Sequence, residues 1–424
     1  MAHPQSIMNG GLRPLIKWIR FLAYFVAVLV IYHLYVGFGP LGTKLPQHSF
    51  DFSWYKTWHP RLPPTGSINT TGLTLNERTK LLEQWVDRAH RKASSAFAKT
   101  SFGGDNIPGS LLRSASKVRH ARATIDCWTQ GRWVPETRDE LIRHKQDPLY
   151  GSCDKRRSTP RPETQYRWQP SGELCGSPLP TPTRQQWCQV LNGRHILLVG
   201  DLVQYQLHEL FLDSLRDGPT VCYGELNCKD HTICTQVDTR LRYLRNDILA
   251  DNRQHLHLEH PLDGVSTVTW PFVTTNVLKE YPILLMNRSP VTEDDDTFIT
   301  TLIHTLSSIR RIRPDILILY RSSPVGHPYC DDADSPLPTS LSDTEKRRLP
   351  FGWAEMDRRN AMARVIVEAA GGVFVDLAAL VETRPDGHVG GNDCLRYCIP
   401  GPLDAWLDVL YQVFTVLQDD PSPP

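Results

Sequence analysis

The amino-acid sequence predicts an α/β fold, in which helices cover both faces of a parallel sheet. A cysteine-rich lobe is expected in front of the sheet and one transmembrane helix at the N-terminus. Three observations predict this: short apolar runs alternate with helical patterns from about residue 193, all ten cysteines lie beyond residue 120, and a long apolar segment stands near the N-terminus. Short apolar strands that alternate with helices are typical of parallel sheets buried on both faces.

The apolar segment near the N-terminus predicts a membrane anchor. Residues 21–41 are apolar except for His33, and they approach the ~20 residues that cross a bilayer. Arg13, Lys17 and Arg20 flank the N-terminal side, so residues 1–20 are expected to be a cytosolic tail. This predicts a single-pass type II membrane protein. A cleaved signal peptide is the alternative, although no small-x-small cleavage site follows cleanly.

Residues 42–125 are predicted to form a stem that contains one helix. The first part is rich in Pro, Gly, Ser and Thr, and Asn69 begins a glycosylation acceptor. Thr74 and Glu77 form a capping-box pattern, behind which apolar residues recur at helical spacing until before Gly103. We expect this helix to lie on the domain. A dimerising coiled coil is less favoured because the pattern spans too few heptads.

Residues 126–192 are predicted to form the cysteine-rich lobe. Ten cysteines is an even number, which is typical of disulfides in an oxidising compartment, but the pairing cannot be deduced from sequence. Zinc on Cys222, Cys228, Cys234 and His231 is the alternative, although structural zinc usually takes more tightly spaced cysteines. We expect no metal and no cofactor. A formal net charge of +1 gives no electrostatic case for binding nucleic acid.

Residues 193–418 are predicted to form the α/β domain. Buried strands are expected over four apolar runs, at residues 195–199, 282–286, 316–320 and 372–375. Helices are expected over the amphipathic stretches 207–215, 298–309, 353–370 and 403–417. Ligands of such sheets bind at the carboxyl ends of the strands, where Gly200, Asp201, Asn287 and Arg321 stand.

The turn after the first strand is where catalysis would be expected. A strand, Gly200-Asp201 and a helix follow one another, so the next side chain is presented at the edge of the sheet. In a serine hydrolase that side chain is the nucleophile, and the helix N-terminus stabilises negative charge beside it. Here the residue is Leu202, which has no hydroxyl group.

Several short motifs follow one another in a fixed order between about residues 127 and 412. They are Gly131-Arg132-Trp133-Val134 after Cys127, Tyr166-Arg167-Trp168, the strand ending in Gly200-Asp201, Arg321-Ser322-Ser323-Pro324 with His327, and Asp393-Cys394-Leu395-Arg396-Tyr397-Cys398-Ile399-Pro400-Gly401. This order resembles the PC-esterase family, the trichome-birefringence-like and capsule-associated polysaccharide O-acetyltransferases. The resemblance implies an SGNH-like (GDSL-like) three-layer sandwich.

The resemblance also implies a serine nucleophile, an Asp-x-x-His pair and an oxyanion hole. Leu202 stands at the serine position and Arg396 at the histidine position. Asp393 matches the aspartate of the pair, and Asn287 matches an asparagine that is expected to help bind an oxyanion. Pocket or oxyanion candidates are Gly200, Asp201, Asn287, Arg321 and His388.

These two replacements remove the expected chemistry. Arginine is permanently protonated and cannot act as a general base, and leucine cannot attack a carbonyl group. Losing the nucleophile or the base of a serine protease triad costs on the order of 10⁶ in turnover. Arg396 can instead form a bidentate ion pair with Asp393. The sequence therefore predicts no intact catalytic set, and a degenerate acyltransferase or esterase, that is, a pseudoenzyme.

Two alternatives concern individual residues. His388, His208, Ser322 or Ser323 could supply a relocated catalytic group, although each is more often a packing or surface residue. The acidic residues 293–296 could bind a cation, but we expect them to cap the helix that follows.

Asn287 also begins an Asn-Arg-Ser glycosylation acceptor, although a proline follows it. We expect this side chain to line a pocket instead, because it directly ends a buried run.

The sequence thus predicts a membrane-anchored glycoprotein of the secretory pathway, resident in the Golgi, whose lumenal domain binds a glycan or serves as a scaffold. A polysaccharide or other glycan is the expected partner. The alternative is an active polysaccharide O-acyltransferase or esterase with relocated catalytic residues. A purely structural membrane protein is a third interpretation.

Overall fold

The computed structural model describes most of the chain beyond residue 72. The described residues are 26, 73–98, 106–136, 153, 161–172, 175, 179–215, 227–251, 268–290, 293–327, 330–342, 345, 355–390 and 393–418, without the side chains of 227–230. The chain divides into two compact units, residues 1–51 and 52–424. The predicted tail, the predicted anchor apart from Val26, and Asn69 lie outside the described residues. No helix within them is long and apolar enough to cross a membrane.

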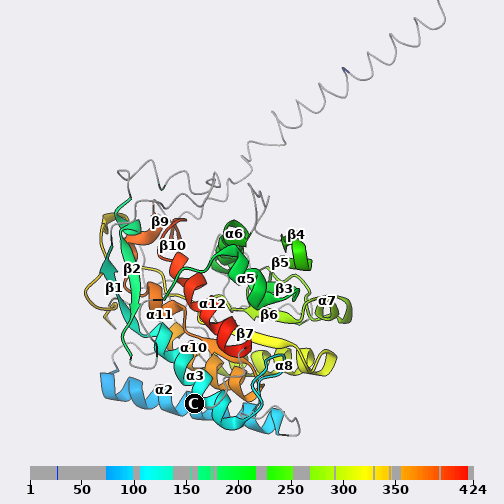
Figure 1. Cartoon of the computed structure of the whole chain (residues 1–424). Helices are drawn as coiled ribbons and strands as arrows, with labels where there is room; N and C mark the ends of the chain where they lie inside the picture. The colour runs from blue at the N-terminus through cyan, green and yellow to red at the C-terminus, as the bar shows by residue number, and fades with distance from the viewer. Residues whose placement is uncertain are drawn as a thin grey trace, which may run out of the picture. The chain divides into compact units, whose positions relative to one another are not determined.

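A six-stranded sheet forms the centre of the second unit (Figure 1). Its strands in spatial order are β4 (Asn227–Cys234), β5 (Thr239–Arg245), β3 (Ile196–Gly200), β6 (Ile283–Met286), β7 (Leu317–Arg321) and β8 (Val373–Val375). β4 pairs antiparallel with β5, and all other pairs are parallel. The predicted α/β class with a mostly parallel central sheet is confirmed.

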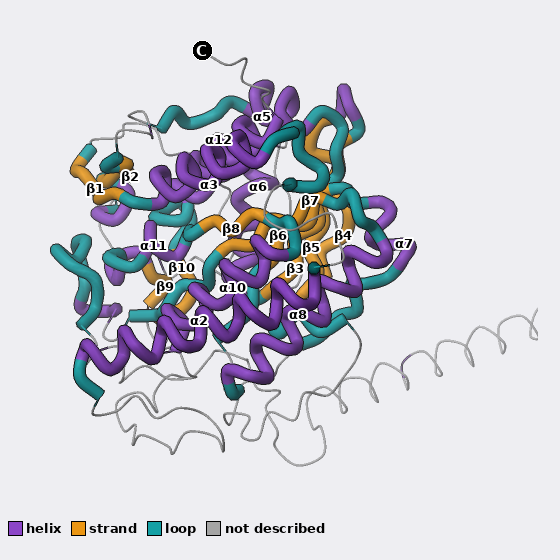
Figure 2. The backbone as a smooth tube through the Cα atoms, turned by 90° about the horizontal axis from the view of Figure 1, so that it is seen from below, coloured by secondary structure: helices purple, strands orange, loops and turns teal. Residues whose placement is uncertain are grey.

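Helices cover the sheet on both sides (Figure 2). One face packs against α3 (Ala115–Thr129), α5 (Arg184–Leu191), α6 (Leu202–Leu215) and α12 (Asp404–Gln418). The opposite face packs against α2 (Leu75–Phe97), α7 (Thr275–Glu280), α8 (Asp295–Ile312) and α10 (Met356–Ala369). Successive residues of β3 alternate between these two cores, as the twofold repeat of a strand requires. The remaining described α-helix, α11 (Ala378–Val381), follows β8.

The helix expected in the stem is a component of one helical layer. The predicted capping box is confirmed, because Thr74 and Glu77 bond reciprocally at the start of α2. Ala89, Ala93 and Phe97 are buried in the same core as α8 and α10. The expected boundary at residues 125/126 falls inside α3, which belongs to the opposite layer. Both helices therefore bury apolar side chains against the sheet, which a free stem would leave exposed.

Disulfides hold the strands and loops together. The described bonds are Cys127–Cys175, Cys153–Cys398, Cys188–Cys234 and Cys330–Cys394. The expected disulfides are thus confirmed, and Cys234 is removed from the zinc alternative because its sulfur is bonded to Cys188. The side chains of Cys222 and Cys228 lie outside the described residues.

Two short antiparallel ribbons flank the sheet. One pairs β1 (Gly131–Pro135) with β2 (Tyr166–Pro170), and the other pairs β9 (His388–Gly390) with β10 (Asp393–Tyr397). Three single-turn 3-10 helices accompany these ribbons. Those at 162–164 and 385–387 precede β2 and β9 in the chain, and the one at 330–332 is joined to β10 by the Cys330–Cys394 disulfide. A fourth, at 235–237, connects β4 to β5. Disulfides at Cys394 and at Cys398, the residue after β10, fix both ends of this last strand.

The acidic residues 293–296 cap α8, as expected, and they also form ion pairs. Asp294 is the N-cap and accepts from the N–H of Thr297 at 2.8 Å. Glu293 pairs with the buried Arg288, with Nη2 and Oε2 2.6 Å apart.

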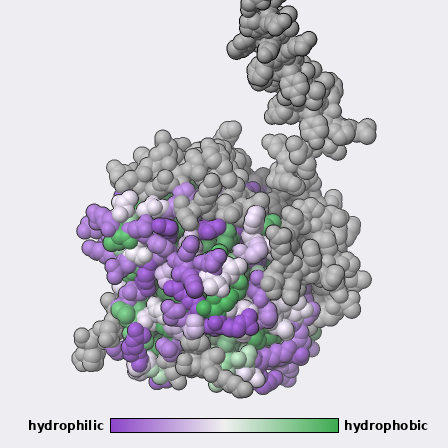
Figure 3. All heavy atoms as spheres, turned by 90° about the vertical axis from the view of Figure 1, so that its right-hand side faces the viewer, coloured by the Kyte–Doolittle hydropathy of each residue, from purple (hydrophilic) through white to green (hydrophobic). Residues whose placement is uncertain are grey.

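Hydrophilic side chains predominate on the described surface seen from the β4 and α7 side, and hydrophobic ones form only small separate groups there (Figure 3). This matches a chain whose apolar residues fill two cores.

Candidate functional site

The candidate site lies where three parallel strands end side by side. Val199 of β3 is in register with Met286 of β6, and Met286 with Tyr320 of β7. The next residues along the three strands are Gly200, Asn287 and Arg321, so these predicted site residues meet at one edge of the sheet.

Asn287 joins the first turn to the loop after β7. Its Oδ1 accepts from the N–H of Asp201 at 3.3 Å, and its Nδ2 donates to Ser323 Oγ at 3.1 Å. A Cβ atom added to Gly200 would lie 1.9 Å from Asn287 Oδ1, so only glycine fits at this point of close approach. Asn287 is fully buried and both ends of its amide are hydrogen-bonded, which argues against glycosylation at this residue.

Asp201 caps α6 and pairs with Arg321. Its Oδ1 accepts from the N–H groups of Val203 and Gln204, both at 3.0 Å. The same oxygen lies 3.2 Å from Arg321 Nη2, and Arg321 Nε donates to Gln204 Oε1 at 2.5 Å. Burial lowers the pKa of the Arg321 guanidinium, and Asp201 opposes that shift. The guanidinium also lies over the ring of Trp406, 5.0 Å from its centroid.

Leu202 is the first residue of α6, directly behind this capped turn. The side chain is 3% exposed. The N-terminus of a helix favours negative charge, which is why a nucleophile and its oxyanion are often placed there. The fold thus provides the turn and the helix end, and a hydrocarbon side chain occupies the position at which the resemblance implies a serine.

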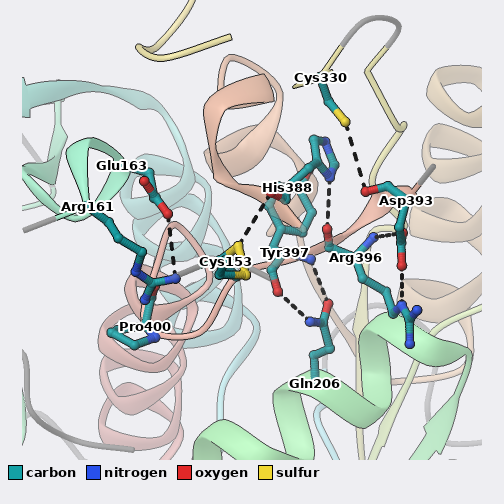
Figure 4. The surroundings of a disulfide bond; sticks show 11 residues. Cys153, Arg161, Glu163, Gln206, Cys330, His388, Asp393, Arg396, Tyr397 and Pro400 are labelled. Atoms are coloured by element: carbon teal, nitrogen blue, oxygen red, sulfur yellow. Dashed lines mark hydrogen bonds and ion pairs between the residues drawn. A yellow bond between two sulfur atoms is a disulfide. The ribbon is translucent and has the colours of Figure 1, made fainter. Parts of the chain in front are cut away.

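The strand β10 lies beside α6. Gln206, one helical turn after Leu202, donates from Nε2 to the carbonyl of Tyr397 at 2.6 Å. The N–H of Tyr397 donates back to Gln206 Oε1 at 3.1 Å (Figure 4). Tyr397 follows Arg396 directly, so the positions of the family's serine and histidine lie on two elements that bond to each other.

Asp393 and Arg396 form the expected ion pair (Figure 4). Arg396 Nε contacts Asp393 Oδ2. The other oxygen, Oδ1, accepts from the backbone N–H groups of Leu395 at 3.2 Å and Arg396 at 2.9 Å. The carboxylate is therefore held by its own strand and by a permanent cation, an arrangement that preserves its position without supplying a base.

His388, on β9, is fully buried and has both ring nitrogens engaged. Its Nε2 lies 2.7 Å from Nδ1 of His327, and its Nδ1 lies 3.1 Å from the carbonyl oxygen of Arg396. The ring stacks on Tyr397 with centroids 4.2 Å apart. These contacts fix the loop around Arg396, which is a packing role, and they do not favour a relocated general base.

The other alternative groups are similarly engaged or unsuited. His208 is fully buried, and desolvation with the nearby His231 lowers its pKa to about 3, which makes it a weak base. Ser322 Oγ accepts from the N–H of Ala378 at 2.7 Å. Ser323 Oγ contacts the carbonyl of Arg288 and accepts from Asn287. All four alternatives therefore have structural roles or an unfavourable environment.

Sequence reasoning missed two features of this edge. Gln204 and Gln206 join α6 to Arg321 and to β10, and the available signal was their polarity inside an apolar helix. A cavity of about 250 Å³ also opens at the ends of β7 and β8, where Asp376 follows β8. The available signal for Asp376 was its position directly after a predicted strand.

The fold and the site together define a disulfide-bonded α/β protein with an asparagine-braced Gly-Asp turn at the carboxyl edge of its sheet. Comparison with known proteins shows that the chain is similar to trichome birefringence-like proteins and xyloglucan O-acetyltransferases, which are named as PC-esterase family proteins. The family resemblance seen in the order of motifs is confirmed.

The individual similarities are distant. The chain is 24% identical over 335 residues to trichome birefringence-like protein 42 of Arabidopsis thaliana, covering 66% of this chain and 87% of that protein. It is 26% identical over 94 residues to xyloglucan O-acetyltransferase 2 of Arabidopsis thaliana. That match covers 20% of this chain and 23% of the relative, so the chain spans less than a quarter of that relative's length. With xyloglucan O-acetyltransferase 4 of Populus trichocarpa it shares 32% identity over 84 residues, 16% of this chain and 20% of the relative.

Among solved structures, the periplasmic domain of a lipopolysaccharide acetyltransferase from Salmonella ser. Paratyphi A matches with a TM-score of 0.33 and 13% identity. That match covers 54% of this chain and 87% of the domain. No protein-family model matches the chain.

Proposed function

We propose that this protein is a glycan-binding or scaffolding relative of polysaccharide O-acetyltransferases that has lost acyl-transfer chemistry. The observation that carries the proposal is Leu202 at the start of α6, behind an otherwise complete Gly200-Asp201 turn. A frame of this kind without a nucleophile keeps the shape that recognises a ligand while it removes the reaction.

The state of the histidine position supports the same proposal. Arg396 is paired with Asp393, so the aspartate cannot orient a base. Because arginine is permanently protonated, Arg396 cannot accept a proton from a nucleophile. The two replacements complement each other, since a nucleophile without a base, or a base without a nucleophile, would still lack turnover.

A glycan is the proposed partner because two of the relatives named above are xyloglucan O-acetyltransferases. The cavity lined by Ser323, to which Asn287 donates, provides a place for a small polar ligand. The alternative of an active enzyme with relocated residues is less well supported, because His388 and Ser322 are fully buried and already hydrogen-bonded.

We further propose that residues 21–41 anchor the chain in a membrane of the secretory pathway, the Golgi, with the α/β domain in the lumen. The apolar segment with its flanking basic residues supports the anchor. Four described disulfides support an oxidising compartment.

A glycan array probed with the purified full-length chain tests the binding function. We expect saturable binding to a subset of plant-type and bacterial-type polysaccharides, with no loss of acetyl groups from acetylated members. Absence of binding to every glycan on a broad array would contradict the proposal.

A further inference from the structure

We propose that His327 and His388 share one excess proton, and that this buried cationic pair is a pH-sensitive connection to the strand that carries Arg396. The two rings join the loop after β7 to the ribbon of β9 and β10. The inference rests on the hydrogen-bonding capacity of the two rings, and it does not depend on the proposed function.

Four ring nitrogens take part in three contacts in a row. Nε2 of His327 lies 2.8 Å from the carbonyl oxygen of Glu382, the residue after α11. Nδ1 of His327 lies 2.7 Å from Nε2 of His388. Nδ1 of His388 lies 3.1 Å from the carbonyl oxygen of Arg396 (Figure 4). His327 is 2% exposed and His388 is fully buried, so the row lies in the protein interior.

The three contacts need three protons. A carbonyl oxygen only accepts, so the two outer nitrogens must each carry a hydrogen. A neutral imidazole has one N–H group, so both rings have then used their single proton. The two inner nitrogens would meet as two lone pairs at 2.7 Å, which is a hydrogen-bonding distance, and a third proton between them removes this conflict. Two rings with three protons carry one positive charge.

The surroundings of His388 favour this charge. Its ring stacks on Tyr397 with centroids 4.2 Å apart, and a cation is attracted to the face of an aromatic ring. Burial raises the pKa of the Tyr397 hydroxyl, so that ring stays neutral. The carbonyl oxygens at both ends of the row accept charge-assisted hydrogen bonds, which are stronger than neutral ones. The buried charge is therefore distributed over a row of hydrogen bonds.

Charged side chains on the neighbouring elements form pairs. Arg384 and Asp386, in the 3-10 helix before β9, share two contacts of 2.8 Å. On β10, Arg396 pairs with Asp393. α6 meets β10 through Gln206, which is neutral. The other ionisable side chains on the surrounding elements are Glu382 after α11, Arg161 and Glu163 around the 3-10 helix at 162–164, and the exposed Asp331 and Asp332 in the 3-10 helix at 330–332.

Loss of the shared proton opens one of the three contacts, because a neutral pair has two protons for three positions. The contact to the carbonyl of Arg396 is the longest of the three, so we expect it to open first. His388 is the partner of Tyr397 in the ribbon, and Tyr397 follows Arg396 directly. β10 is therefore held less firmly around Arg396 once the pair is neutral.

The pair should give stability a maximum with pH. In the unfolded chain each histidine titrates near about pH 6.5, so the two rings carry two extra protons well below that value, one at that value and none well above it. The folded pair carries one throughout this range. Stability rises with pH where the unfolded state binds more protons, and falls where it binds fewer. The contribution of the pair therefore rises up to about pH 6.5 and falls above it.

Urea unfolding of the full-length chain between about pH 5 and about pH 8 tests the inference, with the double variant His327→Gln, His388→Gln as the comparison. We expect the ratio of the variant's unfolding constant to that of the unchanged chain to be largest near about pH 6.5. It should fall on both sides, by up to about tenfold per pH unit. A ratio that only rises with pH would indicate a neutral pair, and one that only falls a doubly charged pair. Either result, or a constant ratio, would overturn the inference.

His90→Gln is the matched control, because this ring is exposed on α2. Its ratio should stay constant over the same range. If the double variant does not fold, amide hydrogen exchange of the unchanged chain decides. After correction for intrinsic exchange rates, protection of β10 should fall as pH rises from about 6.5 to about 8, whereas protection of α8 stays constant. Unchanged protection of β10 over that range would overturn the inference.

Discussion

Gln206 and Tyr397 exchange two hydrogen bonds, at 2.6 Å and 3.1 Å, and so fix α6 against β10. These residues follow Leu202 by one helical turn and Arg396 by one residue. The elements that carry Leu202 and Arg396 are thus bonded to each other. The proposed loss of acyl-transfer chemistry therefore concerns two positions whose elements are bonded to each other.

Restoring both groups should restore some chemistry. We expect Leu202→Ser with Arg396→His to hydrolyse an activated acetyl ester at least about 100-fold faster than the unchanged chain, which is the usual contribution of a general base. Each single variant should stay near the background because it lacks the other partner. The rates are compared by release of the leaving group. Single variants as fast as the double variant would show that the two positions do not cooperate.

Removing Arg321 should destabilise the fold. The Arg321→Met variant leaves Asp201 buried without its cation, and such a loss costs about 3–5 kcal/mol of unfolding free energy. Urea unfolding with the disulfides intact measures this.

The control for that experiment is Arg91→Met, which breaks an exposed ion pair with Asp87 on α2. Its effect should stay below about 1 kcal/mol. Equal losses in the two variants would contradict the importance assigned to the Asp201–Arg321 pair.

Gly200→Ala should lower stability by about 1–3 kcal/mol, because the added methyl group collides with Asn287 Oδ1. Combining it with Asn287→Ala removes the collision, so the double variant should lose less than the sum of the two single losses. Thermal or urea unfolding of the four proteins gives this coupling. Strict additivity would mean that the two side chains do not meet.

Asp247 should make stability depend on pH. It accepts from Arg245 Nε at 3.0 Å and from the N–H of Val268 at 2.7 Å. Burial raises its pKa from 3.8 to about 6, Arg245 opposes that shift, and Asp201 adds to it. A raised pKa in the folded state contributes stability below the unfolded value, and this contribution is lost as pH rises through the folded value.

The matched variant Asp247→Asn does not titrate. The unfolding free energy of the unchanged chain minus that of the variant should therefore fall as pH rises from about 4 to about 6. Urea unfolding across that range measures the difference. A difference that rises with pH would contradict the assigned shift.

Much of the sheet was predictable, because four of its strands are continuous apolar runs buried on both faces. The predicted runs differ by one residue at each end from β3 and β7, and by one residue at the start only from β6 and β8. β5 was missed because Arg240 and Arg242 interrupt its apolar residues, and its buried side chains alternate instead of forming a run. α3 was missed for a similar reason, since basic residues interrupt the stripe that faces the sheet.

The site was partly predictable, because residues that end parallel strands must meet at one edge. That rule predicts that Gly200, Asn287 and Arg321 lie together. It could not place β10 against α6, since that contact depends on side-chain amides of Gln206 and on disulfides whose pairing sequence does not reveal. The cavity at Asp376 depends on the packing of α10, which has no local signature.

Acetyl turnover by the unchanged full-length chain tests the central claim most directly. Supplied with an acetylated polysaccharide or an activated acetyl ester, the purified protein should release or transfer no more acetate than the same protein after heat inactivation. Turnover within the ordinary enzymatic range of about 1–10³ s⁻¹, abolished by Asp393→Asn, would contradict the loss of chemistry assigned to Leu202 and Arg396.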